Sequence, residues 1–130
     1  MAVKNFTQSV TIRASPTAVY QALVDPKQHA AFSGATAKFS QKIGGRFAHY
    51  DGSLEGRVLH LDKNRAIVLA WRSTGWPTGH YSIARFDLTK VRGGTRLVFS
   101  QYGIPASDFR DIRDGWRQYY WEPMKQFLEE

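Results

Sequence analysis

Residues 35–103 consist of short runs in which apolar and polar side chains alternate, separated by sequences typical of tight turns. The turn sequences are Gly44-Gly45, Asp51-Gly52, Asp62-Lys63-Asn64 and Arg92-Gly93-Gly94. Connections this short join antiparallel neighbours, since parallel strands need a crossover of a dozen or more residues. The pattern therefore predicts six strands of one up-and-down antiparallel sheet, at residues 36–40, 46–50, 54–61, 65–73, 80–91 and 95–102.

One strand and two short helices are expected before this region. Residues 5–13 alternate with a period of two, as in a half-buried strand. The inward positions of this strand are Phe6, Gln8, Val10 and Ile12. Ser15-Pro16 and Asp25-Pro26 each combine a helix N-cap residue with a proline at the first helical position. They predict helices over residues 16–25 and 26–32, the second of which ends at Gly34.

A long helix is expected to close the chain. Ser107 and Asp108 offer an N-cap after Pro105, and the helix should run nearly to residue 130. Its apolar positions are Ile112, Trp116, Tyr119, Tyr120, Phe127 and Leu128. Pro123 has no amide hydrogen, so it should bend this helix or leave one upstream carbonyl free. Trp121 falls off the apolar stripe, which predicts a homodimer contact through its ring.

The resulting order is β-α-α-β-β-β-β-β-β-α, an α+β fold. A sheet of six to seven strands with short connections must curl and bury one face, and the last helix is the element long enough to fill the concave side. The 130 residues suit one hydrophobic core, and no linker or repeat interrupts them. We expect a single domain over residues 1–130.

The charge and composition argue against several classes of partner. The formal net charge is +7, but the basic residues are spread among apolar residues and glycines instead of forming one cluster. They predict a solvated basic face, and no nucleic acid is expected. The chain contains no cysteine, no apolar run long enough to span a membrane and no signal-peptide core at its start. A cytoplasmic protein without membrane insertion follows as the expectation.

Neither a metal site nor a catalytic motif is evident in the sequence. The four histidines, His29, His49, His60 and His80, form no pair with metal-ligand spacing. A nucleophile elbow is missing, and Gly44-Gly45 lacks the lysine that follows in a phosphate loop. We therefore expect no metal, no cofactor and no assigned catalytic residue, although acid-base chemistry by His80 or a tyrosine remains open.

An ordered set of short motifs resembles a known superfamily, the START or birch-pollen-allergen-like proteins (SRPBCC), with their helix-grip fold. The branch it resembles is the family named for the C-terminal domain of the chaperone ATPase activator. The motifs are Ala14-Ser15-Pro16 with Val19-Tyr20 and Asp25-Pro26, Gly44-Gly45-Arg46-Phe47, Asp51-Gly52 with Gly56 and Val58, Ile67 to Arg72, Gly94-Thr95-Arg96-Leu97, and Gly115-Trp116. Tyr20 and Phe32 depart from the tryptophans common at these positions.

The resemblance implies a cavity between the sheet and the last helix, in a superfamily whose members bind, transport, cyclise or assist chaperones. Side chains along a strand point alternately inward and outward, and Phe86 and Leu88 are taken as inward. This alternation and the helix motifs give the candidate lining residues. These candidates are Tyr20, Phe32, Phe47, Val58, Leu69, Trp71, Trp76, His80, Ser82, Phe86, Phe99, Gln101, Trp116 and Tyr120. His80 and Gln101 either face the cavity or bond to backbone or water, and Trp76 either covers the cavity mouth or contacts another subunit.

Three functions fit this picture. The first is binding of a small hydrophobic or aromatic molecule in the cavity, without catalysis. The second is an enzyme of cyclase or hydrolase type that would use His80 or Tyr120. The third is a chaperone-associated module whose basic outer sheet face binds a protein partner, ranked lower because the chain starts directly at the first strand. An internal void of roughly 300 Å³ or more favours the first function, and a solid interior favours the third.

Overall fold

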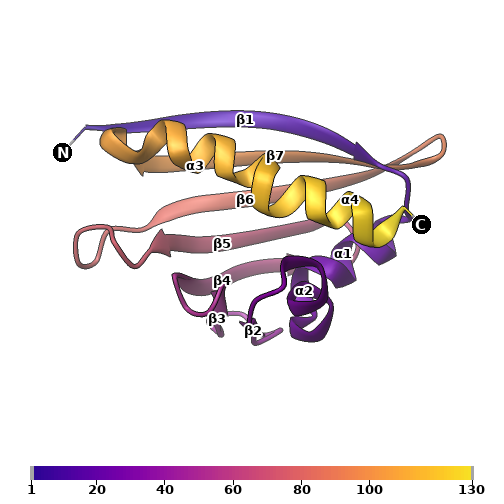
Figure 1. The fold of residues 1–130 in the computed structure, drawn as a ribbon, viewed down its shortest axis with the longest axis horizontal. Helices are drawn as coiled ribbons and strands as arrows, with labels where there is room; N and C mark the ends of the chain where they lie inside the picture. The colour runs from indigo at the N-terminus through magenta and orange to yellow at the C-terminus, as the bar shows by residue number, and fades with distance from the viewer. Residues whose placement is uncertain (1, 130) are drawn as a thin grey trace.

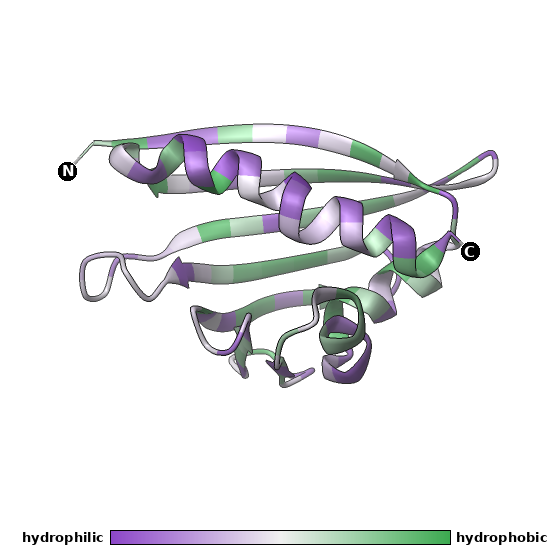
Figure 2. Cartoon of the chain, viewed as in Figure 1, coloured by the Kyte–Doolittle hydropathy of each residue, from purple (hydrophilic) through white to green (hydrophobic). Residues whose placement is uncertain are grey.

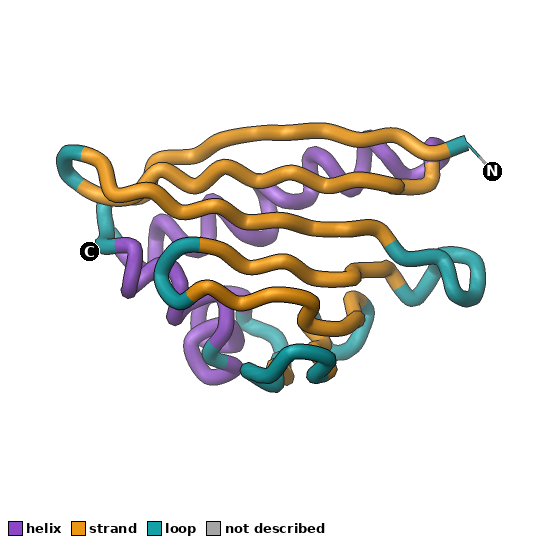
Figure 3. The backbone as a smooth tube through the Cα atoms, turned by 180° about the vertical axis from the view of Figure 1, so that it is seen from behind, coloured by secondary structure: helices purple, strands orange, loops and turns teal. Residues whose placement is uncertain are grey.

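The computed structural model describes residues 2–129, which form one seven-stranded antiparallel sheet and helices on one of its faces (Figure 1). The strand order is β1-β7-β6-β5-β4-β3-β2. The strands are β1 (Val3–Ile12), β2 (Lys38–Phe39), β3 (Arg46–His49), β4 (Leu54–Asp62), β5 (Ala66–Ser73), β6 (Ser82–Val91) and β7 (Gly94–Pro105). Seen from the opposite side, the strands lie unobstructed in front of the long helix (Figure 3). The α+β helix-grip prediction is confirmed.

The two short helices begin as their cap sequences predict. Helix α1 (Pro16–Val24) starts after Ser15, whose hydroxyl oxygen accepts a hydrogen bond from the Ala18 amide at 3.1 Å. Helix α2 (Pro26–Ser33) starts after Asp25, whose carboxylate accepts from the Lys27 amide at 2.9 Å. It ends at Gly34, where a φ of 73° suits glycine. These hydrogen bonds satisfy backbone amides at the starts of the two helices, which lie at one end of the sheet (Figure 1).

The C-terminal helix is continuous and consists of four consecutive segments that together lie across the sheet (Figure 1). They are the 3₁₀ turn η1 (Ala106–Asp108), α3 (Phe109–Trp116), the π-helical segment η2 (Arg117–Trp121) and α4 (Glu122–Leu128). The expectation that Ser107 or Asp108 caps this helix is wrong. Within residues 2–129, neither η1 nor α3 begins with a hydrogen bond to a capping side chain. The helix instead begins through the 3₁₀ turn that leaves β7.

Pro123 is the second residue of α4, just after the π-helical segment. Proline has no amide hydrogen and cannot donate to an upstream carbonyl. The Tyr119 carbonyl accepts a hydrogen bond from the Tyr50 hydroxyl, in the turn after β3. That Pro123 bends the helix or frees one upstream carbonyl stays a prediction.

The core lies between the sheet and the long helix and consists largely of rings. The Phe99 and Trp116 rings are 4.1 Å apart, and the Trp116 and Tyr120 rings 4.3 Å. Ser82, Ala84, Phe86 and Leu88 are buried in alternation along β6, as the predicted parity requires. In Figure 2 the helix alternates between hydrophilic and hydrophobic residues, while β5 is hydrophobic over most of its length. One face of each element therefore supplies the core.

Three sequence expectations for the C-terminal helix are wrong. Trp121 is 3% exposed and packs inside the protein, so its ring is not available for the predicted homodimer contact. A π-helical turn holds more residues than an α turn, which brings Trp121 to the same side as Trp116, with nearly parallel rings 5.5 Å apart. Tyr119 and Phe127 were expected inside, but they are 50% and 38% exposed.

The observed bounds of β2, β6 and β7 differ from those predicted from the sequence. The predicted strand 36–40 shortens to two residues, while β7 extends to Pro105. The predicted strand 80–91 begins at Ser82, because His80 lies in the preceding loop and its Nε2 bonds the Gly103 carbonyl at 2.8 Å. No helix in residues 2–129 is long and apolar enough to cross a membrane.

Candidate functional site

One enclosed cavity lies deep between the sheet and the helix, and its free volume is about 10 Å³, roughly what one water molecule needs. It is lined by Leu23, Phe39, His49, Ile67, Leu69, Trp71, Phe86, Trp116 and Tyr120. A void of several hundred cubic ångströms is not found between these residues, three of which also line a larger and more open space.

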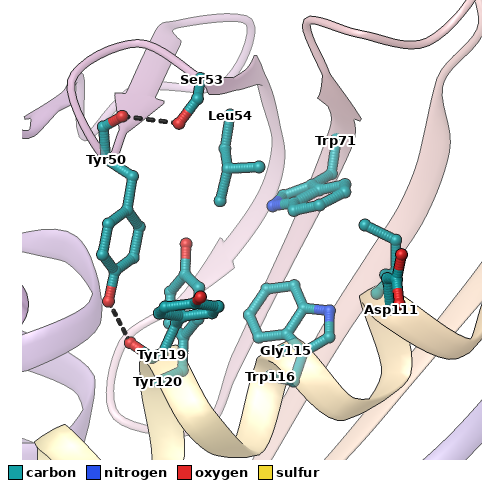
Figure 4. Close-up of a pocket in the computed structure, with 10 residues that line it drawn as sticks. Tyr50, Ser53, Leu54, Trp71, Asp111, Gly115, Trp116, Tyr119 and Tyr120 are labelled. Carbon is teal, nitrogen blue, oxygen red and sulfur yellow. Dashed lines mark hydrogen bonds between the residues drawn. The ribbon is translucent and has the colours of Figure 1, made fainter. Parts of the chain in front are cut away.

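A larger space opens beside the interior, as a groove between the long helix and the start of β4 (Figure 4). We call this space the aromatic groove; its volume is about 260 Å³. It is lined by Tyr50, Ser53, Leu54, Trp71, Asp111, Ile112, Gly115, Trp116, Tyr119 and Tyr120. Five of these ten side chains are tyrosine or tryptophan, so the walls offer large rigid rings.

The groove depends on the turn that joins β3 to β4. Tyr50 and Asp51 adopt positive φ values of 52° and 59°, a conformation that side chains other than glycine rarely hold without support. The support is local: the Asp51 carboxylate accepts from the Thr36 amide and hydroxyl at 2.8 and 2.9 Å, and Ser53 donates to the Tyr50 carbonyl at 2.6 Å. Burial raises the pKa of Tyr50 to about 12, so its hydroxyl stays a donor to the helix at neutral pH.

A chain of buried hydrogen bonds ties the groove floor to the sheet. Trp116 donates from Nε1 to Gln101 Oε1 at 2.8 Å, and Gln101 Nε2 donates to Ser82 Oγ at 2.9 Å. Ser82 in turn donates to the Trp71 carbonyl at 2.8 Å. Because Ser82 and Gln101 satisfy one another inside the sheet, their polar atoms serve the core and do not line the groove.

Few of the candidate lining residues meet around the groove. Those that do are Trp71, Trp116 and Tyr120. The buried remainder in the core comprises Tyr20, Phe47, Val58, Leu69, Ser82, Phe86, Phe99 and Gln101. Phe32 is half-buried against His29 and Phe127, and Trp76 and His80 lie in the loop before β6. His80 and Tyr120, the two residues considered for acid-base chemistry, therefore lie apart: His80 Nε2 bonds the Gly103 carbonyl, and the Tyr120 hydroxyl lies 2.9 Å from His49 Nδ1.

Sequence reasoning missed Tyr50, Leu54 and Asp111 as groove residues. The bond from Tyr50 to the helix has no sequence signal, because it joins residues 69 positions apart. Leu54 and Asp111 line the same groove only because the start of β4 and α3 lie near each other in the fold.

The loop of residues 74–81 is held by Arg72, the residue after Trp71 in β5. Its guanidinium pairs with Glu55 at 2.6 Å and donates to the carbonyls of Trp76 and His80 at 2.9 and 3.3 Å. Trp76 is 4% exposed and packs edge to face against Trp71. Trp76 is thus buried against its own chain and offers no subunit contact.

Replacement of Arg72 by lysine is expected to lower the free energy of unfolding by about 1–3 kcal/mol, because an ammonium cannot reach the carboxylate and both carbonyls at once. Urea unfolding followed by circular dichroism would measure the loss. Arg85→Lys, in an exposed pair with Asp87, is the control and should cost about 0.5 kcal/mol or less. Equal losses in the two variants would contradict the role given to Arg72.

Two buried histidines lie next to the groove. The His29 and His49 rings are stacked at 3.6 Å, and His49 Nδ1 is 2.9 Å from the Tyr120 hydroxyl oxygen. Within residues 2–129, both ring nitrogens of His29 and Nε2 of His49 have no hydrogen-bond partner. Burial lowers the pKa of His29 to about 4 and that of His49 well below its ordinary value. Both rings are neutral at pH 7, and the described chain holds no group of three or more potential metal ligands.

The outer face of the sheet is basic and carries exposed rings. Its exposed cations are Lys38, Arg46, Arg57, Arg85 and Arg96. Two acids on this face are engaged, Glu55 with Arg72 and Asp87 with Arg85. Tyr81, Ile83 and Tyr102 are 46%, 38% and 45% exposed, and Ile83 pairs directly with Tyr102 across β6 and β7. We call this set the outer basic face.

Comparison with known proteins identifies relatives of the whole fold. Human "Activator of 90 kDa heat shock protein ATPase homolog 1" is 32% identical over 92% of this chain, and an uncharacterised protein of Schizosaccharomyces pombe is 29% identical over 93%. The chain spans about a third of the length of these relatives, 36% in both cases.

Solved structures share the architecture. An HSP90 activator from Plasmodium falciparum superposes with a TM-score of 0.89 at 22% identity, over 95% of this chain and 94% of that one. A protein from Chromobacterium violaceum gives a TM-score of 0.80 at 23% identity, over 97% of each chain. The family described as "Activator of Hsp90 ATPase homolog 1-like protein" matches residues 13–129. With nine-tenths of its length matched, the chain belongs to this family.

Proposed function

We propose that this protein is a chaperone-associated binding module that docks on an Hsp90-type ATPase through its outer basic face and stimulates the ATPase activity. The observation that carries the proposal is the outer basic face, where exposed lysine and arginine side chains lie beside the exposed side chains of Tyr81, Ile83 and Tyr102. Exposed rings and cations on one sheet face favour a surface function. The names of the relatives, as activators of a heat shock protein ATPase, supply the kind of partner.

The outer basic face has the composition of a protein-binding surface. Tyrosine and arginine are enriched at the energetic centres of interfaces, and both occur here beside an exposed isoleucine. A shallow hollow of about 400 Å³ lies among these residues. Its lining comprises Lys38, Arg46, Phe47, Ala48, Glu55, Gly56, Arg57 and Tyr81. Since Lys38 and Arg46 form no ion pair among the described residues, their charges are available to an acidic partner surface.

Charge reversal on this face is expected to abolish most of the binding. The double variant Lys38→Glu/Arg46→Glu should weaken binding to a purified Hsp90 by about tenfold or more, with a matching loss of ATPase stimulation. The wild-type affinity should also fall steeply as sodium chloride rises, because the contact is exposed to screening. Isothermal titration calorimetry and a coupled ATPase assay would measure the two effects.

Lys27→Glu/Arg110→Glu changes the net charge equally but lies on helices on the opposite side of the sheet. It should bind as the wild type does. Equal weakening by the two double variants, or binding indifferent to salt, would remove the outer basic face from the proposal. Absence of any binding to Hsp90 would overturn the proposed function itself.

A further inference from the structure

One edge of the sheet is long and has few of the features that protect such edges. In the described chain β1 has a single neighbouring strand, β7, so its other side is a free edge (Figure 1). Charged side chains, proline, bulges or shortness commonly keep edge strands from pairing with other chains. The strand at the opposite edge, β2, is two residues long. β1 has ten residues and no proline, and its one charged residue, Lys4, and its one register shift, between Lys4 and Phe6, lie at its start. From Phe6 to Ile12 the edge is thus regular and open to another strand.

The alternation of hydrogen bonds across the sheet identifies which backbone groups point to this edge. The Leu88 amide donates to the Arg65 carbonyl at 2.7 Å, on the side of β5. Its partner across β6 and β7, Leu97, therefore directs its own backbone groups away from β6 and toward Val10 of β1. Every second residue of β1 is bonded to β7 in this way, and the residues between direct their N–H and C=O groups out of the sheet: Thr7, Ser9 and Thr11. Neither a strand nor a turn in residues 2–129 bonds these groups.

A hollow of about 340 Å³ lies along this edge, on the side of the sheet that faces the long helix. It is bounded by residues 8–10 of β1 and by the helix. Trp121 lines it and donates a hydrogen bond from Nε1 to the Gln8 side-chain oxygen, which holds the helix to the edge strand. A strand paired with β1 would direct every second side chain into this hollow and the others to the outer face of the sheet.

The charges around the hollow favour acidic side chains. Its lining includes three cations and two acids: Arg113, Arg117 and Lys125, and Asp114 and Glu122. Arg113 and Asp114 pair with each other, which leaves two cations against one carboxylate. Lys4, whose ammonium group lies over the Phe109 ring of α3, adds a positive charge at the start of the strand, and β1 contains no acidic residue. An extended segment with carboxylates on the hollow side would form ion pairs as well as backbone hydrogen bonds.

A second copy of this chain fits the edge less well. Antiparallel pairing of two copies through β1 would place both helices on one face of the joined sheet, with their hollows side by side. The cations in excess, Arg117 and Lys125, would then face the same cations of the other copy, and like charges repel. The occupant that the charges favour is therefore a different chain.

We propose that the free edge of β1 pairs, in antiparallel orientation, with an extended acidic segment of another protein. The segment bonds the backbone groups of Thr7, Ser9 and Thr11, and its carboxylates lie in the hollow beside Arg117 and Lys125. About seven residues, at about 3.4 Å per residue, are enough to cover the three backbone positions. This pairing does not involve the outer basic face, and it holds whether or not the protein docks on an Hsp90-type ATPase.

The test uses an acetylated and amidated heptapeptide, Thr-Glu-Val-Glu-Val-Glu-Thr, whose three glutamates share one face of a strand. Titration into ¹⁵N-labelled full-length protein, followed by NMR, should shift the amide signals of Thr7, Ser9 and Thr11 and slow their hydrogen exchange. The lysine analogue, Thr-Lys-Val-Lys-Val-Lys-Thr, should bind about tenfold or more weakly. A third peptide, with N-methyl groups on the two valines, lacks the amide hydrogens that would face β1 and should not bind.

Two pairs of variants test the edge and the hollow separately. Ser9→Pro removes an outward amide hydrogen and no bond to β7, a position at which edge strands tolerate proline. It should abolish peptide binding, while Ser9→Ala binds as the wild type does. Arg117→Glu should lower the affinity about tenfold or more, whereas Arg110→Glu, on the same long helix but outside the hollow, should not. If Ser9→Pro does not fold, the methylated peptide tests the same hydrogen bonds on the wild-type chain.

Equal binding of the methylated and the parent peptide would overturn the inference, as would equal binding of the acidic and the basic peptide. Peptide-induced shifts confined to the outer basic face would do the same. Light scattering of the free protein in dilute solution should give a monomer. A dimer whose β1 amides are protected from exchange would assign the edge to a second copy and would also overturn the inference.

Discussion

Replacement of Trp116 by alanine is expected to lower the free energy of unfolding by about 3–5 kcal/mol. The ring contacts Phe99 and Tyr120 with centroid distances of 4.1 and 4.3 Å, and it is 2% exposed. Its loss would leave a cavity between the sheet and the long helix. It would also leave Gln101 Oε1, buried in the sheet, without its donor. Urea unfolding followed by circular dichroism at 25 °C would measure the change.

Tyr119→Ala is the matched control for this experiment. Tyr119 is a neighbouring aromatic residue in the same helix and is 50% exposed, so its removal should cost less than about 1 kcal/mol. Its carbonyl, which binds the Tyr50 hydroxyl, belongs to the backbone and persists in the variant. If the two substitutions destabilise the protein equally, the helix does not pack on the sheet as described.

Acidification below about pH 6.5 is expected to destabilise the protein through its stacked histidines. The pKa of His29 is lowered by burial from 6.5 to about 4, so between these values the unfolded chain binds more protons than the folded one. The free energy of unfolding therefore falls as the pH drops through this window, by about 3 kcal/mol in total for His29. His49 acts in the same direction, since its pKa is also lowered by burial and by the neighbouring His29. Urea unfolding at pH 7.5, 6.5, 5.5 and 5 would trace the loss.

Two variants separate the buried histidines from general acid effects. His29→Leu removes one of the two buried histidines and should reduce the pH dependence between pH 6.5 and 5. His60→Asn removes an exposed histidine and should leave the wild-type dependence in place. The carboxylates with lowered pKa, Asp51 and Glu129, lose their contribution only at more acidic pH. A His29→Leu variant that loses stability between pH 6.5 and 5 as fast as the wild type would refute the assignment.

The sequence predicted those parts of the fold that depend on local chemistry. Proline after a capping residue defined α1 and α2, and alternation defined the sheet. Trp121 was misplaced because a regular helical period was assumed where the chain forms a π-helical segment. One extra residue in a turn is enough to move a side chain from surface to core.

The candidate site was less predictable, for a different reason. Strand parity identifies which side chains point inward, but it does not say whether they leave a space between them. Here Phe86, Phe99 and Trp116 fill the concave side of the sheet, and the open groove lies at its margin. Leu54 and Asp111 line the groove although they are 57 positions apart in the chain, and no sequence period relates them.

The bond between Tyr50 and the Tyr119 carbonyl joins the β3–β4 turn to the long helix, two segments 69 positions apart in the sequence. Both residues also line the groove. A substitution that removes the Tyr50 hydroxyl would therefore change the attachment of the turn to the helix as well as the groove wall, so these two properties cannot vary independently at this position.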